Sequence, residues 1–205
     1  MKKYFVTAIH TDSGKTLVSA ILTQALQADY WKPVQTGSDY RDADTVKRLL
    51  NNNHSIIHDE AYLLKAPKSP HAAAAMEGKL IDIDNITLPI TDGNNLVIEG
   101  AGGVLVPLND KHFVIDLAEK FDAEVILVSN IYLGSINHTL LTIQELKRRN
   151  AKVKGIIFNG ERDKYTEDII LKHSGYKCLL RIDKEESISE VEVTKYAIKL
   201  FDNWE

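Results

Sequence analysis

The sequence predicts an α/β fold: a mostly parallel β-sheet with helices on both faces. Short apolar runs rich in β-branched residues alternate along the chain with segments whose apolar residues recur at helical spacing. Most of these runs are apolar on consecutive positions, which is typical of strands buried on both faces. Strands that alternate with helices form right-handed βα units, and such sheets bind ligands at the carboxyl ends of their strands.

Six apolar runs are the expected strands, and five amphipathic segments are the expected helices. The strands are residues 4–9, 96–101, 124–129, 153–158 and 177–182, with a weaker run at 30–35. The helices are residues 15–28, 42–53, 113–122, 138–150 and 189–204. Residues 54–94, with three prolines, are the least regular part and are expected to form excursions on the same domain. The whole chain, residues 1–205, is expected to fold as one domain.

The composition favours a cytoplasmic protein that binds neither nucleic acid nor membrane. A formal net charge of -4 supplies no electrostatic attraction to either anionic partner. No run approaches the roughly 18 apolar residues of a membrane span, and the N-terminus does not resemble a signal peptide. The seven histidines show no zinc-ligand spacing. Cys178 is the only cysteine, which excludes an internal disulfide, and it is expected to be a small core residue of a strand.

Gly14-Lys15-Thr16 follows the first strand by a few residues and opens the first helix, which is the setting of a phosphate-binding loop. In that setting backbone N–H groups face the phosphates, Lys15 reaches the outer phosphates and the Thr16 hydroxyl ligates Mg²⁺. The general pattern also places a glycine five positions before Gly14, where this chain has Ile9. The alternative is an accidental tripeptide in a surface turn, which the strand–turn–helix context disfavours.

Glu99 lies at the end of an apolar strand, directly before Gly-Ala-Gly-Gly. A carboxylate at the end of a buried strand is costly unless it has a cation or hydrogen-bond donors. The glycines that follow allow the backbone to approach a ligand closely. In a phosphate-binding protein this is the place for a second acid associated with Mg²⁺. The alternative is a glycine-rich turn with an exposed glutamate.

Lys32 closes the weaker strand, and Pro33 then removes an amide donor and fixes the chain direction. Next to a phosphate-binding loop, a lysine here could neutralise charge on a transferred phosphoryl group. The alternative is an ordinary surface lysine. The acidic run that follows, Asp39, Asp42 and Asp44, is either a solvated turn and helix cap or the source of one Mg²⁺ partner.

Leu-Gly-Ser-Ile-Asn, residues 133–137, leads from a strand into a helix. Its amides can form a second anion site. Equally, it can be a glycine turn in which Ser135 or Asn137 caps the helix. The residues alone do not decide between the two.

Six short stretches, in this order, resemble the dethiobiotin synthetases, ATP-dependent ring-closing enzymes of biotin synthesis. They are "TDSGKT" at 11–16, "KPVQTGS" at 32–38, "SPHAAAAMEG" at 69–78, "VIEGAGG" at 97–103, "LGSINHTLLT" at 133–142 and "FNG" at 158–160. The resemblance covers most of residues 1–160. The combination is specific, although no single stretch is.

The resemblance implies a three-layer P-loop fold and a homodimer with active sites at the subunit interface. It implies that ATP, CO₂ and 7,8-diaminononanoate give dethiobiotin, ADP and phosphate, with Mg²⁺ as cofactor. One amine is first carboxylated to a carbamate, whose oxygen attacks the γ-phosphate. The second amine then attacks the carbamate carbon and loses a proton, which closes the ring and displaces phosphate. Chemistry between anions needs cations and amides to gather the charges, which fits the residues above.

The resemblance also implies roles for individual residues. The catalytic residues are Lys15 and Lys32, which stabilise the transferred phosphoryl group, and Thr11, which lies by the diamine and carbamate. ATP is bound by Asp12, Ser13, Gly14, Lys15, Thr16, Leu17, Asp44, Glu99, Gly100, Ala101, Gly102, Asn159 (on the adenine) and Gly160. Mg²⁺ is held by Thr16, Asp44 and Glu99. The substrate is contacted by Thr36 and, from the second subunit, by Gly134, Ser135, Ile136 and Asn137.

The loop before Lys15 departs from the family pattern at several positions. Ala8 replaces the usual glycine, Ile9-His10 replaces a more polar pair, and Asp12 stands where glutamate is usual. The family loop starts at Ala8, so Ile9 is not the position that needs glycine. We expect Ala8 to be tolerated, because a left-handed backbone is not required there.

Two further departures concern the metal and the base. The spacer after Lys32 is short, so both Asp42 and Asp44 are candidates for the metal; Asp44 is preferred because it opens the helical pattern. Near the C-terminus, "LLRIDKEES" replaces the family's proline-containing turn, so base contacts from residues 182–185 are not carried over.

Three other classes of protein share parts of this pattern. A related amide-forming ligase usually carries a glutamine-hydrolysing domain, for which this chain has no room. A nucleotide switch of the chromosome-partitioning type has a signature lysine early in the loop, but no lysine lies between Lys3 and Lys15. An α/β binding module that has lost nucleotide affinity is the third.

Overall fold

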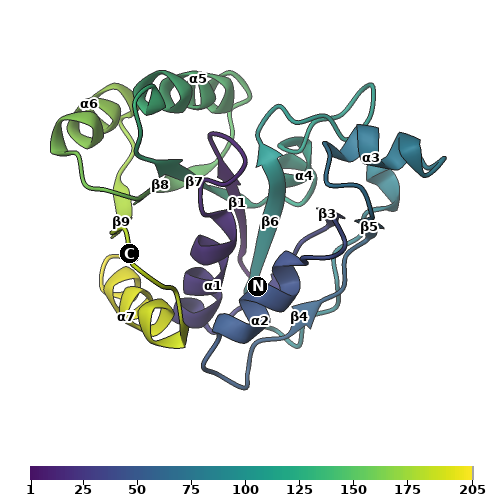
Figure 1. Cartoon of the computed structure of the whole chain (residues 1–205), viewed down its shortest axis with the longest axis horizontal. Helices are drawn as coiled ribbons and strands as arrows, with labels where there is room; N and C mark the ends of the chain where they lie inside the picture. The colour runs from purple at the N-terminus through teal and green to yellow at the C-terminus, as the bar shows by residue number, and fades with distance from the viewer. Residues whose placement is uncertain (205) are drawn as a thin grey trace.

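A computed structural model describes residues 1–204 of the chain. At its centre, seven strands form a parallel sheet in the order β4-β2-β6-β1-β7-β8-β9 (Figure 1). The strands, in chain order, are β1 (Lys3–Ala8), β2 (Asp29–Trp31), β4 (Ile57–His58), β6 (Leu96–Gly103), β7 (Glu124–Asn130), β8 (Val153–Asn159) and β9 (Cys178–Ile182). The predicted parallel α/β sheet is confirmed.

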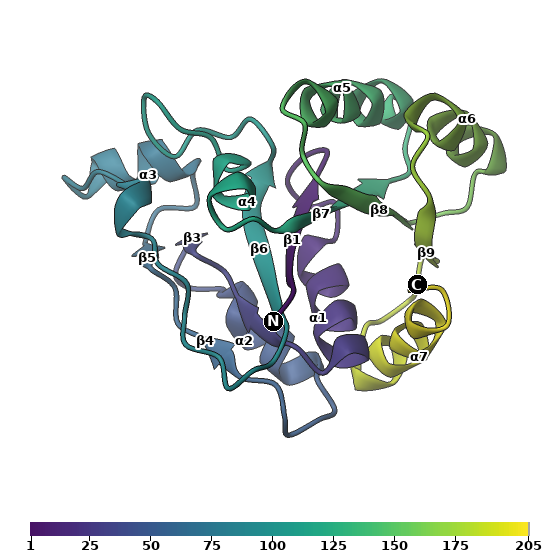
Figure 2. The same ribbon diagram turned by 180° about the vertical axis from the view of Figure 1, so that it is seen from behind.

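Helices cover both faces of the sheet, and Figures 1 and 2 show the two sides. One face carries α1 (Lys15–Leu26), α2 (Asp42–Leu49) and α7 (Glu190–Phe201). The other carries α4 (Asp116–Lys120), α5 (Ser135–Arg148) and α6 (Lys164–Ser174). A small annex beside β6 contains the two-stranded sheet of β3 (Val34–Thr36) and β5 (Tyr62–Leu64), the helix α3 (Pro70–Met76) and the 3₁₀ turn η1 (Ile83–Asn85).

The alternation of side chains along β1 explains why this strand lies at the centre. Tyr4, Val6 and Ala8 pack into the core layer shared with α1 and α7, whereas Phe5 points into the opposite layer. All four are almost completely buried. Because both faces are covered, the strand is apolar on consecutive positions, which is the pattern in its sequence.

The weaker run at 30–35 is divided in the structure. β2 ends at Trp31 and pairs with β6, while β3 begins at Val34 and pairs with β5. Pro33 lies between them; it cannot donate to a ladder, but its carbonyl accepts from the Tyr62 amide at 3.0 Å. The chain therefore leaves the main sheet at Lys32, immediately beside the first loop.

Other differences from the sequence prediction concern element limits and two helices. α2 ends at Leu49 rather than at residue 53, and α5 begins at Ser135 rather than at residue 138. α3 and α6 were not predicted; α6 is capped by Asp163, whose carboxylate accepts from the Tyr165 and Thr166 amides. The expectation for Cys178 is wrong: it is exposed at the first position of β9, before the strand enters the core.

Within residues 1–204, no helix combines the length and the apolar character that crossing a membrane requires.

Candidate functional site

The loop between β1 and α1 lies at the carboxyl edge of the sheet. Two of its residues have left-handed backbones, Asp12 (φ 61°) and Gly14 (φ 94°). A Cβ on Gly14 would lie 2.3 Å from Asn159 Nδ2, so only glycine fits there. Ala8 is the last residue of β1 and has no left-handed backbone, as expected, so the backbone there does not require the family's glycine.

Lys15 is folded back along the loop that precedes it. Its side chain is 7 % exposed, and Nζ donates to the His10 carbonyl at 3.3 Å. The Ser13 hydroxyl donates to the same carbonyl at 3.0 Å, which fixes the curve of the loop. Burial lowers the pKa of Lys15 below its usual value, because desolvation disfavours the ammonium. An anion bound in the loop would favour the charged form of Lys15.

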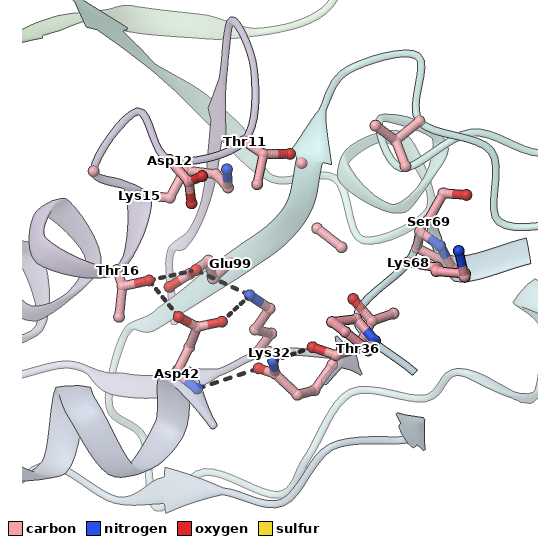
Figure 3. Close-up of a pocket in the computed structure, with 17 residues that line it drawn as sticks. Thr11, Asp12, Lys15, Thr16, Lys32, Thr36, Asp42, Lys68, Ser69 and Glu99 are labelled. Carbon is pink, nitrogen blue, oxygen red and sulfur yellow. Dashed lines mark hydrogen bonds and ion pairs between the residues drawn. The ribbon is translucent and has the colours of Figure 1, made fainter. Parts of the chain in front are cut away.

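Thr16, Lys32, Asp42 and Glu99 form one polar cluster next to the loop (Figure 3). The Thr16 hydroxyl donates to Asp42 Oδ1 at 2.6 Å and lies 3.1 Å from Glu99 Oε1. Lys32 Nζ forms ion pairs with Glu99 Oε1, at 3.2 Å, and with Asp42 Oδ2. Four elements meet here: α1, the end of β2, the start of α2 and β6.

The electrostatics of this cluster keep its charges paired. Glu99 is 1 % exposed, and the Tyr30 hydroxyl donates to its Oε2 at 3.0 Å. Burial opposes the charge of Lys32, but Glu99 and Asp42 outweigh it and raise the pKa of Lys32. Burial also opposes the charge of Asp42, yet Lys32 and the Thr16 hydroxyl bring the pKa of Asp42 below its usual value. The contact between Lys32 and Asp42 is therefore ionic.

Asp44 lies outside this cluster, contrary to the choice made from the sequence. It is exposed on α2, two positions beyond Asp42, and does not line the cavity. Asp42 is the first residue of α2, and its amide donates to Gln35 Oε1 at 3.2 Å. Two positions correspond to about 200° around a helix, so the two side chains point in nearly opposite directions. The geometry thus brings Asp42, not Asp44, to Thr16 and Glu99.

A cavity of about 660 Å³ joins the loop to the annex. Thr11, Lys15 and Thr16 line one side, and Thr36, Lys68 and Ser69 line the other (Figure 3). Of the residues predicted to bind ATP, those that line it are Asp12, Gly14, Lys15, Thr16, Glu99, Ala101 and Gly102. The cavity therefore joins the candidate phosphate site to a separate polar wall.

Three polar residues that line the cavity were given no role from the sequence: Gln35, Lys68 and Ser69. Ser69 could have been found, because it opens the "SPHAAAAMEG" stretch. Gln35 lies in the "KPVQTGS" stretch but was given no role, since its contact with the Asp42 amide depends on how the chain turns between them.

Several predicted site residues lie outside this cavity. Ser13, Leu17 and Gly100 belong to the same loop, helix and strand but do not line it. Asn159, at the end of β8, donates from Nδ2 to the Ser13 carbonyl at 2.9 Å, so it contacts the outer side of the loop. Gly160 follows it, with a left-handed backbone (φ 110°).

The turn at 134–137 also lies outside the cavity of its own chain. Gly134 (φ 106°) is the N-cap of α5, and no side chain caps the helix there. This excludes the helix cap that the sequence allowed: neither Ser135 nor Asn137 caps α5. Gly134 and Ile136 line a different hollow, together with Glu161 and Arg162.

The donor set of the cluster fits a hard divalent cation. The Thr16 hydroxyl and the carboxylates of Asp42 and Glu99 converge as oxygen donors, the ligand type that Mg²⁺ prefers. Tyr30 and Lys32 hold the carboxylates in place. The residues therefore fit the Mg²⁺ that a phosphate-binding loop normally uses.

The fold and the site together define a P-loop nucleotide-binding protein. The family described as "AAA domain" matches residues 2–192. The chain is 68 % identical to the ATP-dependent dethiobiotin synthetase of Cytophaga hutchinsonii over 100 % of this chain and 99 % of that protein. It is 49 % identical to the enzyme of the same name from Christiangramia forsetii, over 97 % and 95 %. The chain belongs to the ATP-dependent dethiobiotin synthetase family.

Solved structures at low identity share the fold. A putative plasmid partition protein of Borrelia burgdorferi matches with a TM-score of 0.59 and 11 % identity, over 100 % of this chain and 99 % of that one. The septum site-determining protein MinD of Pyrococcus horikoshii matches with a TM-score of 0.57 and 15 % identity, over 100 % and 96 %. At these identities the similarity is one of architecture.

Proposed function

We propose that this protein uses ATP to carboxylate 7,8-diaminononanoate with CO₂ and to close the ring of dethiobiotin, releasing ADP and phosphate. The observation that carries the proposal is the cavity that brings Lys15 and the Lys32–Asp42–Glu99 cluster to the same space as Thr11 and Thr36. A phosphate site and a polar substrate wall within one cavity are what a phosphoryl transfer between bound molecules needs. Membership of the synthetase family supports the substrate.

The reaction transfers a negatively charged phosphoryl group, and the cations of the site stabilise this charge. One amine nitrogen bonds to the carbon of CO₂ and loses a proton, which gives a carbamate. A carbamate oxygen then attacks the γ-phosphorus, and ADP leaves. The second amine attacks the carbamate carbon, the ring closes and phosphate leaves. Lys15 and Lys32, both buried, stabilise the charge on the transferred group, and Thr11 and Thr36 position the diamine and carbamate.

We assign the Mg²⁺ ligands as Thr16, Asp42 and Glu99, replacing Asp44 of the sequence prediction. When bound, the ion supplies positive charge to the β- and γ-phosphates. Within the protein, Lys32 keeps the two carboxylates together and Tyr30 orients Glu99. Asn159 is the proposed contact for adenine, because it lies against Ser13 and Gly14 of the loop and does not line the cavity that holds the substrate wall.

The proposed enzyme is a homodimer in which each turn at 134–137 contacts the substrate bound by the other subunit. The turn lies outside the cavity of its own chain, so it is free for this role. Four apolar side chains near it and near the start of α5 are exposed: Leu105, Leu133, Ile136 and Leu141. Exposed apolar groups of this kind mark protein interfaces. The cytoplasmic location expected from the sequence remains a prediction.

Phosphate release tests the function directly. The wild-type protein with Mg²⁺ and ATP should release phosphate rapidly only when diaminononanoate and bicarbonate are both present, and dethiobiotin should form in equal amount. Turnover that ignores the diamine would contradict the proposal and favour a nucleotide switch. No turnover in any mixture, with no thermal shift from nucleotide, would favour an inactive binding module.

A further inference from the structure

The guanidinium of Arg181 contacts three groups at the edge of the sheet. Arg181 lies in β9, and its Nε forms an ion pair with Glu167 Oε1 of α6 at 2.6 Å. One terminal nitrogen donates to the Gly160 carbonyl at 2.9 Å, and the other donates to the Ile182 carbonyl. The two charged side chains are only 16 % and 12 % exposed. The ion pair is therefore largely shielded from solvent. In such a low-dielectric environment, electrostatic contacts are stronger than they are in water.

These contacts join the carboxyl ends of two neighbouring strands. Asn159, the last residue of β8, pairs with Ile182, the last residue of β9. The Gly160 amide donates to the Ile182 carbonyl at 3.1 Å, so this oxygen receives two hydrogen bonds and both of its lone pairs are used. In Figure 1, β8 and β9 lie side by side with α6 above them. Arg181 thus fastens the ends of both strands to α6 through Glu167.

The end of β8 is in turn attached to the phosphate-binding loop. Asn159 Nδ2 donates to the Ser13 carbonyl at 2.9 Å, and the Asn159 carbonyl accepts from the Ile131 amide at 2.9 Å. The fit against Gly14 is so close that an added Cβ would lie 2.3 Å from the amide nitrogen. A small displacement of Asn159 would therefore move the loop or lose its contact.

Arg181 itself is not among the residues that line the cavity, so any effect on ATP must pass through Asn159 and the loop. The guanidinium is suited to this, because its planar set of five donors can serve a carboxylate and two carbonyls at once. A lysine has the same charge but a single ammonium on a flexible stem.

We infer that Arg181 is a positioning residue of the nucleotide site. It holds the ends of β8 and β9 so that Asn159 fixes Ser13 and Gly14 in the conformation that receives the phosphates. Its influence is on ATP and not on the diamine wall, because its contacts lead to Asn159 and the loop and not to the residues of that wall. The inference rests on the proposed use of ATP.

The test removes the ion pair without leaving a buried charge. In the double variant Arg181→Met/Glu167→Gln, apolar and neutral side chains of similar size replace the pair, a change that buried ion pairs often tolerate. We expect the KM for ATP and its Kd by calorimetry to rise about tenfold, the effect of losing one charged hydrogen bond. The KM for diaminononanoate should stay within about twofold of the wild-type value, because the variant does not change the residues proposed to bind the diamine. Arg181→Lys should recover only part of the ATP affinity.

Two controls make the result decisive. Arg48→Met, at an exposed position in the last turn of α2, should leave both KM values unchanged. In an Asn159→Ala background the double change should alter the KM for ATP by less than about twofold, because coupled residues are not additive. An unchanged KM for ATP in the folded double variant, or full additivity with Asn159→Ala, would overturn the inference. If wild-type protein fails to release phosphate with all substrates present, the proposed function itself fails instead.

Discussion

Lys32 is the residue on which the two carboxylates of the site converge. The sequence identified it as a lysine at a strand end followed by proline, but it equally allowed a surface lysine. The structure buries it between Asp42 and Glu99. What decided between the two was the path of the chain after Trp31, which no local pattern specifies.

Replacing Lys32 tests its role in phosphoryl transfer. In Lys32→Ala, turnover should fall by at least about 100-fold, since a positioned cation stabilises the charge that develops on the transferred group. Nucleotide binding should be largely retained, because Lys15 and the loop remain. Phosphate release and ATP calorimetry measure the two effects, with Lys47→Ala on the exposed face of α2 as the matched control. Unchanged turnover would remove Lys32 from the mechanism.

The two aspartates of α2 can be separated by matched amide variants. In Asp42→Asn, the Mg²⁺ concentration for half-maximal turnover should rise on the order of tenfold or more, because a ligand loses its charge while its shape is kept. Asp44→Asn, which changes an exposed side chain, should leave it unchanged. Titration of phosphate release with Mg²⁺ measures both. The reverse pattern would restore the choice made from the sequence.

Among the elements, β1 and the loop after it were the best predicted. The apolar run and the Gly-Lys-Thr tripeptide fix a strand, a turn and a helix start, and Gly14 is essential because of its backbone and its contact with Asn159. The missed helix α6 is a different case. Its stop signal, Gly175, and its cap, Asp163, are both in the sequence, but three of its four buried residues, Thr166, Glu167 and Ser174, are polar, so no continuous apolar stripe marks the helix.

Ala8→Gly tests whether the family's glycine is needed at the end of β1. Ala8 is buried in extended backbone, so glycine would remove a packed methyl group and add chain entropy to the unfolded state. We expect the free energy of unfolding to fall by about 1–2 kcal/mol with no gain in ATP affinity. Urea denaturation and calorimetry check this. A tighter Kd for ATP in the variant would mean that Ala8 does restrict the loop.

The C-terminal half of α5 contains a pH-sensitive contact. Arg148 and Arg149 hydrogen-bond Glu145 and lower its pKa from 4.5 to about 2. A depressed carboxylate pKa stabilises the fold fully above the unfolded value, and this stabilisation is lost as the pH falls from about 4.5 to about 2. Glu145→Gln should therefore lower Tm at pH 7 and flatten its decline over that acidic range. Parallel Tm–pH curves for the two proteins would contradict this.

For the whole molecule, the sequence defined the order of strands and helices but not the annex. β5 and α3 lie in the part that was expected to form irregular excursions, and β3 was expected to continue the strand at 30–35, because short strands and a helix of seven residues carry little periodicity. Yet they form the second wall of the cavity. Their position depends on long-range pairing between residues 34–36 and 62–64.

Dimer formation is tested at the exposed apolar face beside α5. Leu141→Glu places a charge at an exposed position of that helix, which a buried interface would not tolerate. We expect sedimentation to change from dimer to monomer and diamine-dependent turnover to be lost, while ATP still binds. Phe201→Glu, at a similarly exposed position on α7, should remain dimeric and active. A wild-type monomer with full activity would contradict the proposed dimer.

The sequence by itself determined the parallel α/β fold, the phosphate-binding loop and the family, because each depends on local patterns: buried runs, helical spacing and short motifs. Only the tertiary structure decided that Asp42 rather than Asp44 joins Thr16 and Glu99, and that Arg181 fastens the strand ends behind the loop. A two-residue offset on a helix turns a side chain by about 200°, and residues distant in sequence meet only through packing. Such choices are made by the assembled core and not by any one segment.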